Sequence, residues 1–232
     1  MKKVVSPVLA VLTLLVLNSF IMPDLPKEEV RKLETFSGIG IAVSADVFYT
    51  PGTTHEIRIE GDDKDVRDLR TEVRDGFLQV KYDNLRVRHS KVTLYITSKE
   101  LETLKISGSA QFECGEAITS EEIDLAMSGS GGILFDKLVA DEVEVKISGS
   151  GDIEIRNGSA DELGAKISGS GKLHAEKFEV SEFTAAISGS GAVRITAKDE
   201  LDVKISGSGK VYYHGNPQVH SVSSGSGKTV AL

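Results

Sequence analysis

The triplet Ser-Gly-Ser occurs seven times from residue 107 onward, and its spacing is nearly constant. The triplets begin at residues 107, 128, 148, 168, 188, 206 and 224, so the intervals are 21, 20, 20, 20, 18 and 18 residues. A flexible linker has a biased composition but no such register. A fixed period of about 20 residues is typical of a repeat protein in which equivalent units stack on one another.

Each repeat unit contains two runs in which apolar and polar residues alternate. Before one triplet the apolar positions are Val143, Val145 and Ile147, and after it they are Ile153 and Ile155. A period of two indicates β-strands, because successive side chains of a strand point to opposite sides. The recurrent glycines argue against helices in this half of the chain.

These features predict an all-β fold, namely a single-stranded parallel β-helix of ~20-residue coils with an N-terminal β-rich cap. The usual preference for right-handed connections favours a right-handed column. Propeller blades need about 40 residues or more, and the framework of leucine-rich repeats is missing. One buried column is expected to contain Ile106, Met127, Ile147, Ile167, Ile187 and Ile205.

The Ser-Gly-Ser-Gly stretch itself has two interpretations. Counting from Ile147 places Gly149 and Gly151 on the inward side and Ser148 and Ser150 on the outward side, which favours a bend within an extended strand. The alternative is a turn with a positive φ angle at glycine. The outward serines form a candidate ladder that consists of Ser148, Ser150, Ser168, Ser170, Ser188, Ser190, Ser206 and Ser208.

The serine ladder has a structural and a functional interpretation. In the structural interpretation, which we favour, stacked hydroxyls hydrogen-bond one another between coils and hold the column together. In the functional interpretation, identical groups repeat at ~4.8 Å intervals and contact a repetitive ligand.

The N-terminus resembles an export signal. Lys2 and Lys3 precede an apolar run from Val8 to Leu17, as in a secretory signal peptide. Residues 4–22 also approach the ~20 residues that span a bilayer, so an uncleaved membrane anchor stays open. Both interpretations place the rest of the chain in the periplasm or on the cell surface. We expect residues 1–22 to be signal peptide or anchor, 23–35 a polar spacer and 36–232 the β-helix domain, with 36–100 as cap and first coils and 101–232 as SGSG repeats.

Residues 36–100 differ from the repeats and are interpreted as the cap that a solenoid needs at its open end. Residues 56–59 and 92–97 read as strands, and Val66 and Leu69 suit a short helical turn. Asp75-Gly76 lies between two alternating runs, which predicts a hairpin.

The segment FSGIGIAVSADVFYTPGTTHEIRIEGDDKDVRDLRTEVRDGFLQV (36–80), followed by KISGSG repeats, resembles a bacterial family called putative auto-transporter adhesin, head GIN domain. The resemblance covers roughly residues 36–230. It implies an exported β-helix protein of the kind found mostly in Bacteroidetes, and it transfers no catalytic residues. One departure is the missing lipobox cysteine, which leaves the mode of membrane attachment open.

Composition and local motifs exclude several classes of function. The net charge is −8 and there is no basic cluster, so nucleic acid is not an expected partner. The single cysteine, Cys114, is expected to be a packed apolar residue. The stretch GSGKT (225–229) lacks the first glycine of a phosphate-binding loop. Lys172 replaces Asp152 in the next coil, which excludes a calcium-binding column. We therefore expect no cofactor, no metal and no catalytic residue.

The sequence thus favours an exported, non-enzymatic β-helix that acts as an adhesin or a cell-envelope scaffold for an unknown protein or glycan ligand. The alternative is a carbohydrate-active β-helix enzyme, which would need two carboxylates about 5–10 Å apart on one face. Two further functions stay open. One is a serine ladder that orders water, by analogy with ice-binding solenoids, and the other is a docking element for an envelope partner.

Overall fold

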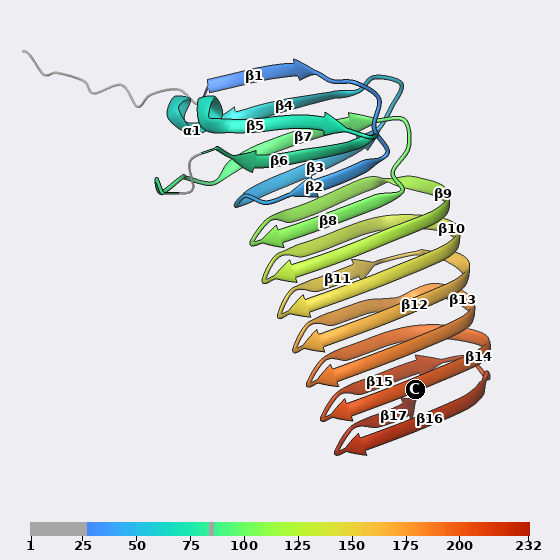
Figure 1. Ribbon diagram of the computed structural model, residues 1–232. Coiled ribbons are helices and arrows are strands. Elements are labelled where there is room, and N and C mark those ends of the chain that lie inside the picture. The colour runs from blue at the N-terminus through green and yellow to red at the C-terminus, as the bar shows by residue number, and fades with distance from the viewer. Residues whose placement is uncertain (1–26, 84–85) are drawn as a thin grey trace, which may run out of the picture.

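Alternating apolar and polar residues produce a column of stacked coils with an N-terminal cap at one end (Figure 1). The computed structural model describes residues 27–83 and 86–232. The coils form a β-solenoid of about six turns, so the predicted fold class is confirmed. The predicted signal or anchor, residues 1–22, lies outside the described residues.

The cap consists of short strands and one short helix. Its elements are β1 (Lys27–Lys32), β2 (Gly38–Ile41), β3 (Ala45–Pro51), β4 (Glu56–Gly61), α1 (Asp63–Asp68), β5 (Leu69–Arg74), β6 (Phe77–Tyr82) and β7 (Val92–Ser98). The strands predicted near 56–59 and 92–97 and the helical turn are confirmed. Asp75 and Gly76 have φ angles of 50° and 73°, and they join β5 to β6 in the expected hairpin.

The prediction of a polar spacer at 23–35 is wrong for residues 27–32. This segment forms β1, which pairs antiparallel with β4 from Lys27 opposite Gly61 to Lys32 opposite Glu56. Its composition is polar because charged side chains of β1 make ion pairs at the rim of the cap rather than packing in the apolar core. A strand whose hydrogen-bond partner is 24 or more residues away leaves little local signal in the sequence.

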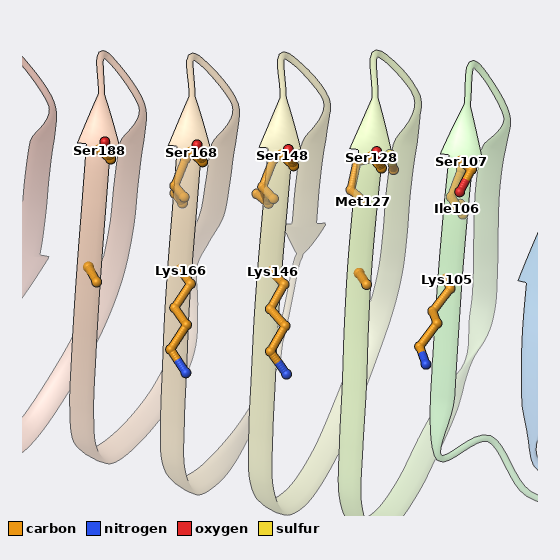
Figure 2. A pocket seen from close by; sticks show the side chains of 14 residues that line it. Lys105, Ile106, Ser107, Met127, Ser128, Lys146, Ser148, Lys166, Ser168 and Ser188 are labelled. Atoms are coloured by element: carbon orange, nitrogen blue, oxygen red, sulfur yellow. The ribbon is translucent and has the colours of Figure 1, made fainter.

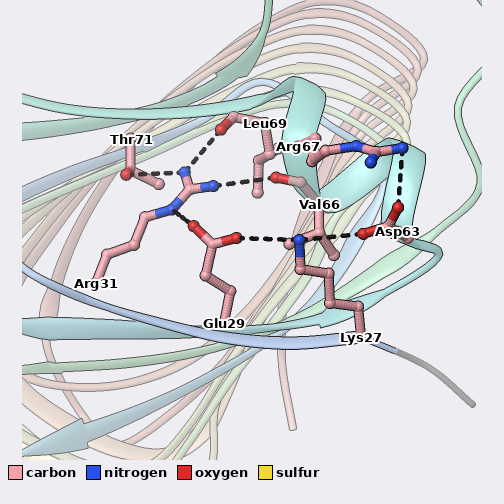
Figure 3. Close-up of polar contacts among 8 residues, drawn as sticks. All are labelled: Lys27, Glu29, Arg31, Asp63, Val66, Arg67, Leu69 and Thr71. Atoms are coloured by element: carbon pink, nitrogen blue, oxygen red, sulfur yellow. Dashed lines mark hydrogen bonds and ion pairs between the residues drawn. The ribbon is translucent and has the colours of Figure 1, made fainter.

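Arg31 fastens β1 to the helical side of the cap (Figure 3). Its guanidinium donates to the carbonyl oxygens of Leu69 at 2.7 Å and Val66 at 3.0 Å, and to the hydroxyl of Thr71 at 3.2 Å. Glu29 on the same strand accepts at 2.8 Å from Arg31 Nε. These charge-assisted hydrogen bonds satisfy carbonyls at the end of α1 and orient β1 across the end of the column.

A buried carboxylate, Asp65, joins α1 to the segment before β7. His89 Nδ1 lies 3.0 Å from one carboxylate oxygen, and the backbone N–H of Ser90 donates to the other at 3.0 Å. The His89 ring stacks on Tyr82 with a centroid distance of 3.6 Å. Burial alone would raise the pKa of Asp65, but the hydrogen bonds from His89 and Ser90 outweigh it and lower the pKa.

The coils are built from long strands that bend around the column. Their elements are β8 (Thr103–Gly108), β9 (Gln111–Gly129), β10 (Gly132–Gly149), β11 (Asp152–Ile155), β12 (Gly158–Gly169), β13 (Lys172–Gly189), β14 (Ala192–Gly207), β15 (Lys210–His214), β16 (Gln218–Gly225) and β17 (Lys228–Ala231). Neighbouring coils pair in parallel, and β8 and β9 pair with β2 and β3 of the cap. The cap and the column therefore share one continuous hydrogen-bonded ladder.

The predicted apolar column is confirmed. Ile106, Met127, Ile147, Ile167, Ile187 and Ile205 lie opposite one another in successive coils, and each is at most 3% exposed. In the last coil Ser223 takes the place of Ile205. Each fully buried Ile contributes roughly 1.5–3 kcal/mol to stability, so this column alone is a substantial part of the folding free energy.

The interpretation of SGSG as a bend within an extended strand is wrong, because the chain makes a turn there. The first glycine has a positive φ angle in every repeat, 118° at Gly149, and the strand ends at this residue. A Cβ on Gly149 would lie 2.5 Å from the carbonyl oxygen of Gly129. Gly151 stays outside the left-handed region but is buried against Met127 and Gly131. The alternation of inward and outward positions could not distinguish a bend from a turn, because the serines point outward in both.

The change in spacing from 20 to 18 residues occurs at one corner of the coil. Between β13 and β14 the register passes from Ala175 opposite Ile195 directly to Glu179 opposite Thr196, and it shifts again before Glu182 opposite Glu200. From there to Gly189 opposite Gly207 the pairing is continuous. The stretch that leads into each turn therefore keeps its length.

Substitution of Gly149 by Ala tests the turn. The positive φ angle and the Gly129 carbonyl leave no relaxed position for a methyl group, so we expect a loss of about 1–3 kcal/mol in the free energy of unfolding. Ser150→Ala in the same turn is the control and should stay within about 0.5 kcal/mol of the wild type. Urea denaturation measures both. Equal stability of the two variants would contradict the role assigned to the turn.

The lowered pKa of Asp65 predicts a pH dependence of cap stability. A carboxylate whose pKa is lower in the folded than in the unfolded protein stabilises the fold above the unfolded pKa of ~3.9. This stabilisation is lost as the pH falls through the lower folded value. Thermal unfolding of wild type and Asp65→Asn should show the variant to be less stable at neutral pH, with the difference shrinking in acid. A difference that is constant with pH would contradict the assignment.

Candidate functional site

The outward side of the stretch that leads into each turn forms a flat surface, which we call the long face. It comprises four outward columns, represented in one coil by Glu142, Glu144, Lys146 and Ser148. Continuous pairing from coil to coil brings equivalent residues into line along the column. The long face is therefore a grid whose rows are coils and whose columns are sequence positions.

All eight serines of the candidate ladder are exposed on the structure. Ser148, Ser168, Ser188 and Ser206 are the first serines of their repeats and lie opposite one another on the strands. Ser150, Ser170, Ser190 and Ser208 follow the positive-φ glycines and lie in the turns between strands. The structure thus separates the ladder into a strand column on the long face and a turn column at its edge.

The hydrogen bonds between coils at this ladder come from the backbone. The N–H of Ser150 donates to the carbonyl of Gly129 at 2.9 Å, and the N–H groups of Ser170 and Ser190 make the equivalent bonds at 2.8 Å. Within the described residues, no hydroxyl of the eight ladder serines forms a hydrogen bond to another protein group; the bonded hydroxyls of the last coils are Ser221 and Ser223. The favoured interpretation of stacked, mutually bonded hydroxyls is therefore wrong, and these hydroxyls face outward.

A second column, which the sequence analysis missed, lies beside the serines. It holds the outward residue two positions before each first serine: Lys105, Ala126, Lys146, Lys166, Ala186 and Lys204. Val222 continues it in the last coil and is 69% exposed. The signal was present in the sequence, because each of these residues has a fixed offset from its triplet, but the residue type varies while the triplet does not.

The serine and lysine–alanine columns line a shallow groove of about 530 Å³ that crosses five coils (Figure 2). Its lining includes Lys105, Lys146 and Lys166 together with the first serines from Ser107 to Ser188. A second groove of about 370 Å³ continues past Ala186 to Val222 and Ser224. We call the two together the trough. Its floor is largely apolar because of Ala126, Ala186 and the methylene stems of the lysines.

The lysine–alanine column has the serines on one side and a column that contains carboxylates on the other. Lys146 Nζ lies 3.4 Å from Asp124 and 3.7 Å from Glu144, and Lys166 Nζ also lies 3.7 Å from Glu144. Gly164 permits this arrangement, because a side chain there would collide with the Glu144 carboxylate. The lysines therefore separate the trough from the acidic half of the long face.

The last column of the long face is a ladder of like charges. Glu122, Glu142, Glu162, Glu182 and Glu200 lie opposite one another in five successive coils. At the junction with the cap, Glu100 and Glu102 add to this charge, and an acidic hollow of about 780 Å³ forms there. Glu122 and Asp124 both line it and lie two residues apart on the same side of β9. Lys99 donates a hydrogen bond to Glu100 and lowers the pKa of that carboxyl group.

The remaining sequence motifs have structural roles. Cys114 is buried, and burial raises the pKa of its thiol to about 11. Asp152 lies opposite Gly132 and Lys172, which leaves no carboxylate column for calcium. Over residues 27–83 and 86–232, no group of three or more His, Cys, Asp or Glu side chains is arranged to hold a metal ion. The same residues contain no helix that is long and apolar enough to span a membrane.

Comparisons with known proteins agree with this architecture. The sequence model of the family described as "Putative auto-transporter adhesin, head GIN domain" matches residues 35–217. A putative adhesin from Bacteroides fragilis NCTC 9343 has 21% identity and a TM-score of 0.85, over 90% of this chain and 98% of that chain. A putative lipid binding protein from Parabacteroides distasonis ATCC 8503 has 23% identity and a TM-score of 0.73, over 90% and 97%.

A putative adhesin from Parabacteroides merdae ATCC 43184 has 23% identity and a TM-score of 0.71, also over 90% and 97% of the two chains. At these identities the similar structures show a common fold and nothing more specific. The search of the curated proteins found no match.

Proposed function

This chain belongs to the putative auto-transporter adhesin, head GIN domain family, and from that premise we propose that it is an exported, non-enzymatic adhesion or envelope-scaffold module that binds its ligand along the long face. The observation that carries the proposal is the trough, which repeats the same exposed hydroxyl and a neighbouring Lys or Ala side chain in register over successive coils. Ligand sites of similar volume are apolar with a few polar groups, as here.

Repetition is the property that favours binding over catalysis. A catalytic site needs one constellation with distinct groups in distinct roles, whereas the trough offers equivalent groups at ~4.8 Å intervals. Several weak contacts with one extended ligand add as avidity, even when each contact is worth little. The names of the similar proteins, which include adhesins and a lipid binding protein, support binding as the shared theme.

Binding along the long face predicts that filling the serine column removes it. The triple variant Ser148→Gln, Ser168→Gln and Ser188→Gln places larger side chains along one wall of the trough, and we expect at least tenfold weaker binding to the strongest ligand on an array of neutral and acidic glycans. The control changes Asp152, Lys172 and Ala192 to Gln, since these outward residues lie in the coils that follow the same three turns but on another face. Both variants should keep the wild-type melting temperature. Equal binding by the two triple variants would remove the long face from the proposal.

A second candidate function, glycan cleavage, is favoured by the acidic hollow. Residues two apart on one side of a strand have Cα atoms about 6.6 Å apart, so the carboxylates of Glu122 and Asp124 can reach the separation that paired glycosidase carboxylates use. A glycosidase also needs one carboxyl group that is protonated before reaction, and Glu100 is unsuited to that role because its pKa is lowered.

The two candidates are separated by a hydrolysis assay. We expect the full chain to release no reducing ends from the glycans that it binds. Release that is abolished by Glu122→Gln, but not by Glu182→Gln in the same column away from the hollow, would instead establish an enzyme. The array experiment and the hydrolysis assay together decide between binding and cleavage.

A further inference from the structure

The lysine–alanine column of the trough has a pattern of its own. In order of coils it reads Lys105, Ala126, Lys146, Lys166, Ala186 and Lys204. Each alanine thus lies between two lysines that are two coils apart, or about 9.6 Å at ~4.8 Å per coil. We call these two places notches: the first lies between Lys105 and Lys146, and the second between Lys166 and Lys204. Figure 2 shows the flanking lysines of the first notch on either side of the strand that carries Met127.

Each notch offers three kinds of contact to a ligand. The alanine methyl and the lysine stems provide an apolar floor, the first serine of the same coil provides a hydroxyl, and the two ammonium groups provide positive charge at both ends. A sugar ring matches this set, because its C–H face packs on apolar surface while its hydroxyl and carboxylate groups accept hydrogen bonds.

The shape of the trough favours a polymer over an amphiphile. A small-ligand site encloses most of its ligand's surface, commonly 70–90%, but the trough is open along its whole length on the long face. An acyl chain lying there would keep much of its apolar surface in water. An extended polymer whose exposed side is polar has no such penalty. Because the two notches begin three coils apart, a chain with a charge on every second sugar fits one notch at a time.

We propose that the trough binds a linear polysaccharide that carries one carboxylate on every second sugar. The inference rests on the proposed function of the long face and adds the ligand class. The two lysines of each notch are spaced for successive carboxylates of such a chain, with the intervening uncharged sugar over the alanine. A neutral glycan can accept hydrogen bonds from the lysines but forms no charge pair with them.

The acidic columns set an upper limit on the charge of the ligand. Asp124 and Glu144 flank the lysines on the side away from the serines, and the ladder of glutamates lies beyond them. A polymer with a charge on every sugar would place a carboxylate over the alanine of the notch that it occupies, where no cation compensates for this repulsion. Each notch therefore selects for sparse negative charge.

The lysines are able to bind a second carboxylate. Lys204 makes no ion pair with a carboxylate within the described residues, and Lys105 lies over the Phe77 ring at 5.4 Å. Lys146 and Lys166 share Glu144 at 3.7 Å, and Lys146 also donates a hydrogen bond of 3.4 Å to Asp124, yet their side chains stay 51% and 66% exposed.

The test compares three immobilised polysaccharides by biolayer interferometry with the full chain. The probes are hyaluronan oligosaccharides, with a carboxylate on alternate sugars, polygalacturonate, with one on every sugar, and neutral dextran. We expect the order of affinity to be hyaluronan, polygalacturonate, dextran. Lys105→Ala with Lys204→Ala should weaken hyaluronan binding roughly fivefold or more, because two exposed charge contacts are lost. The matched control is Lys172→Ala with Lys210→Ala, which removes the same charge from another face and should bind as the wild type does.

A second variant tests the notches rather than the charge. Ala126→Lys with Ala186→Lys makes the lysine column continuous, and we expect the preference to change from hyaluronan to polygalacturonate. A uniform increase for both polymers with no change of order would mean unspecific attraction and would overturn the inference. An equal loss of hyaluronan affinity in the two lysine double variants would also overturn it. So would a result in which no polysaccharide binds but the trough binds a fluorescent fatty acid that palmitate displaces. Binding of neutral glycans that is lost in the serine triple variant would overturn this inference alone and leave the proposed function intact.

Discussion

In-register stacking of one coil on the next is the constraint on which the rest of the structure depends. The backbone ladder continues through the turns, where Ser150 N–H meets Gly129 C=O at 2.9 Å. A slip of one residue would carry Ile167 and its equivalents from the core to solvent. The apolar column and the positive-φ glycines therefore fix the same register for independent reasons, one through burial and the other through the shape of the turn.

The same register produces the long face without any further requirement. Once Ile147 and Ile167 lie opposite one another, the residues beside them on the outward side must also line up. The fold thus makes columns of whatever residue occupies a given position. The serine column is uniform from Ser107 to Ser224, whereas the adjacent column holds lysine in four coils, alanine in two and valine in the last.

Much of the fold could be read from the sequence, because period-two alternation and a 20-residue repeat leave few architectures. The inward column from Ile106 to Ile205 and the outward ladder followed directly from counting. The turn at Gly149 did not, because a bend and a turn give the same parity. Strand β1 was missed because its partner β4 is distant in the chain and its side chains are polar. The lysine–alanine column was missed because the invariant triplet identified the repeat, while the informative residues were those that change between repeats.

The shift in coil length lies at a corner, between Ala175 and Glu182, and the stretch from Glu182 to Gly189 pairs without interruption with the next coil. Insertions and deletions at that corner consequently leave the geometry of the long face untouched. A lineage of such proteins can gain or lose residues there, and can duplicate whole coils, while the spacing of the exposed grid is preserved. The solenoid thus separates the part of its sequence where the coil length changes from the part that forms the long face.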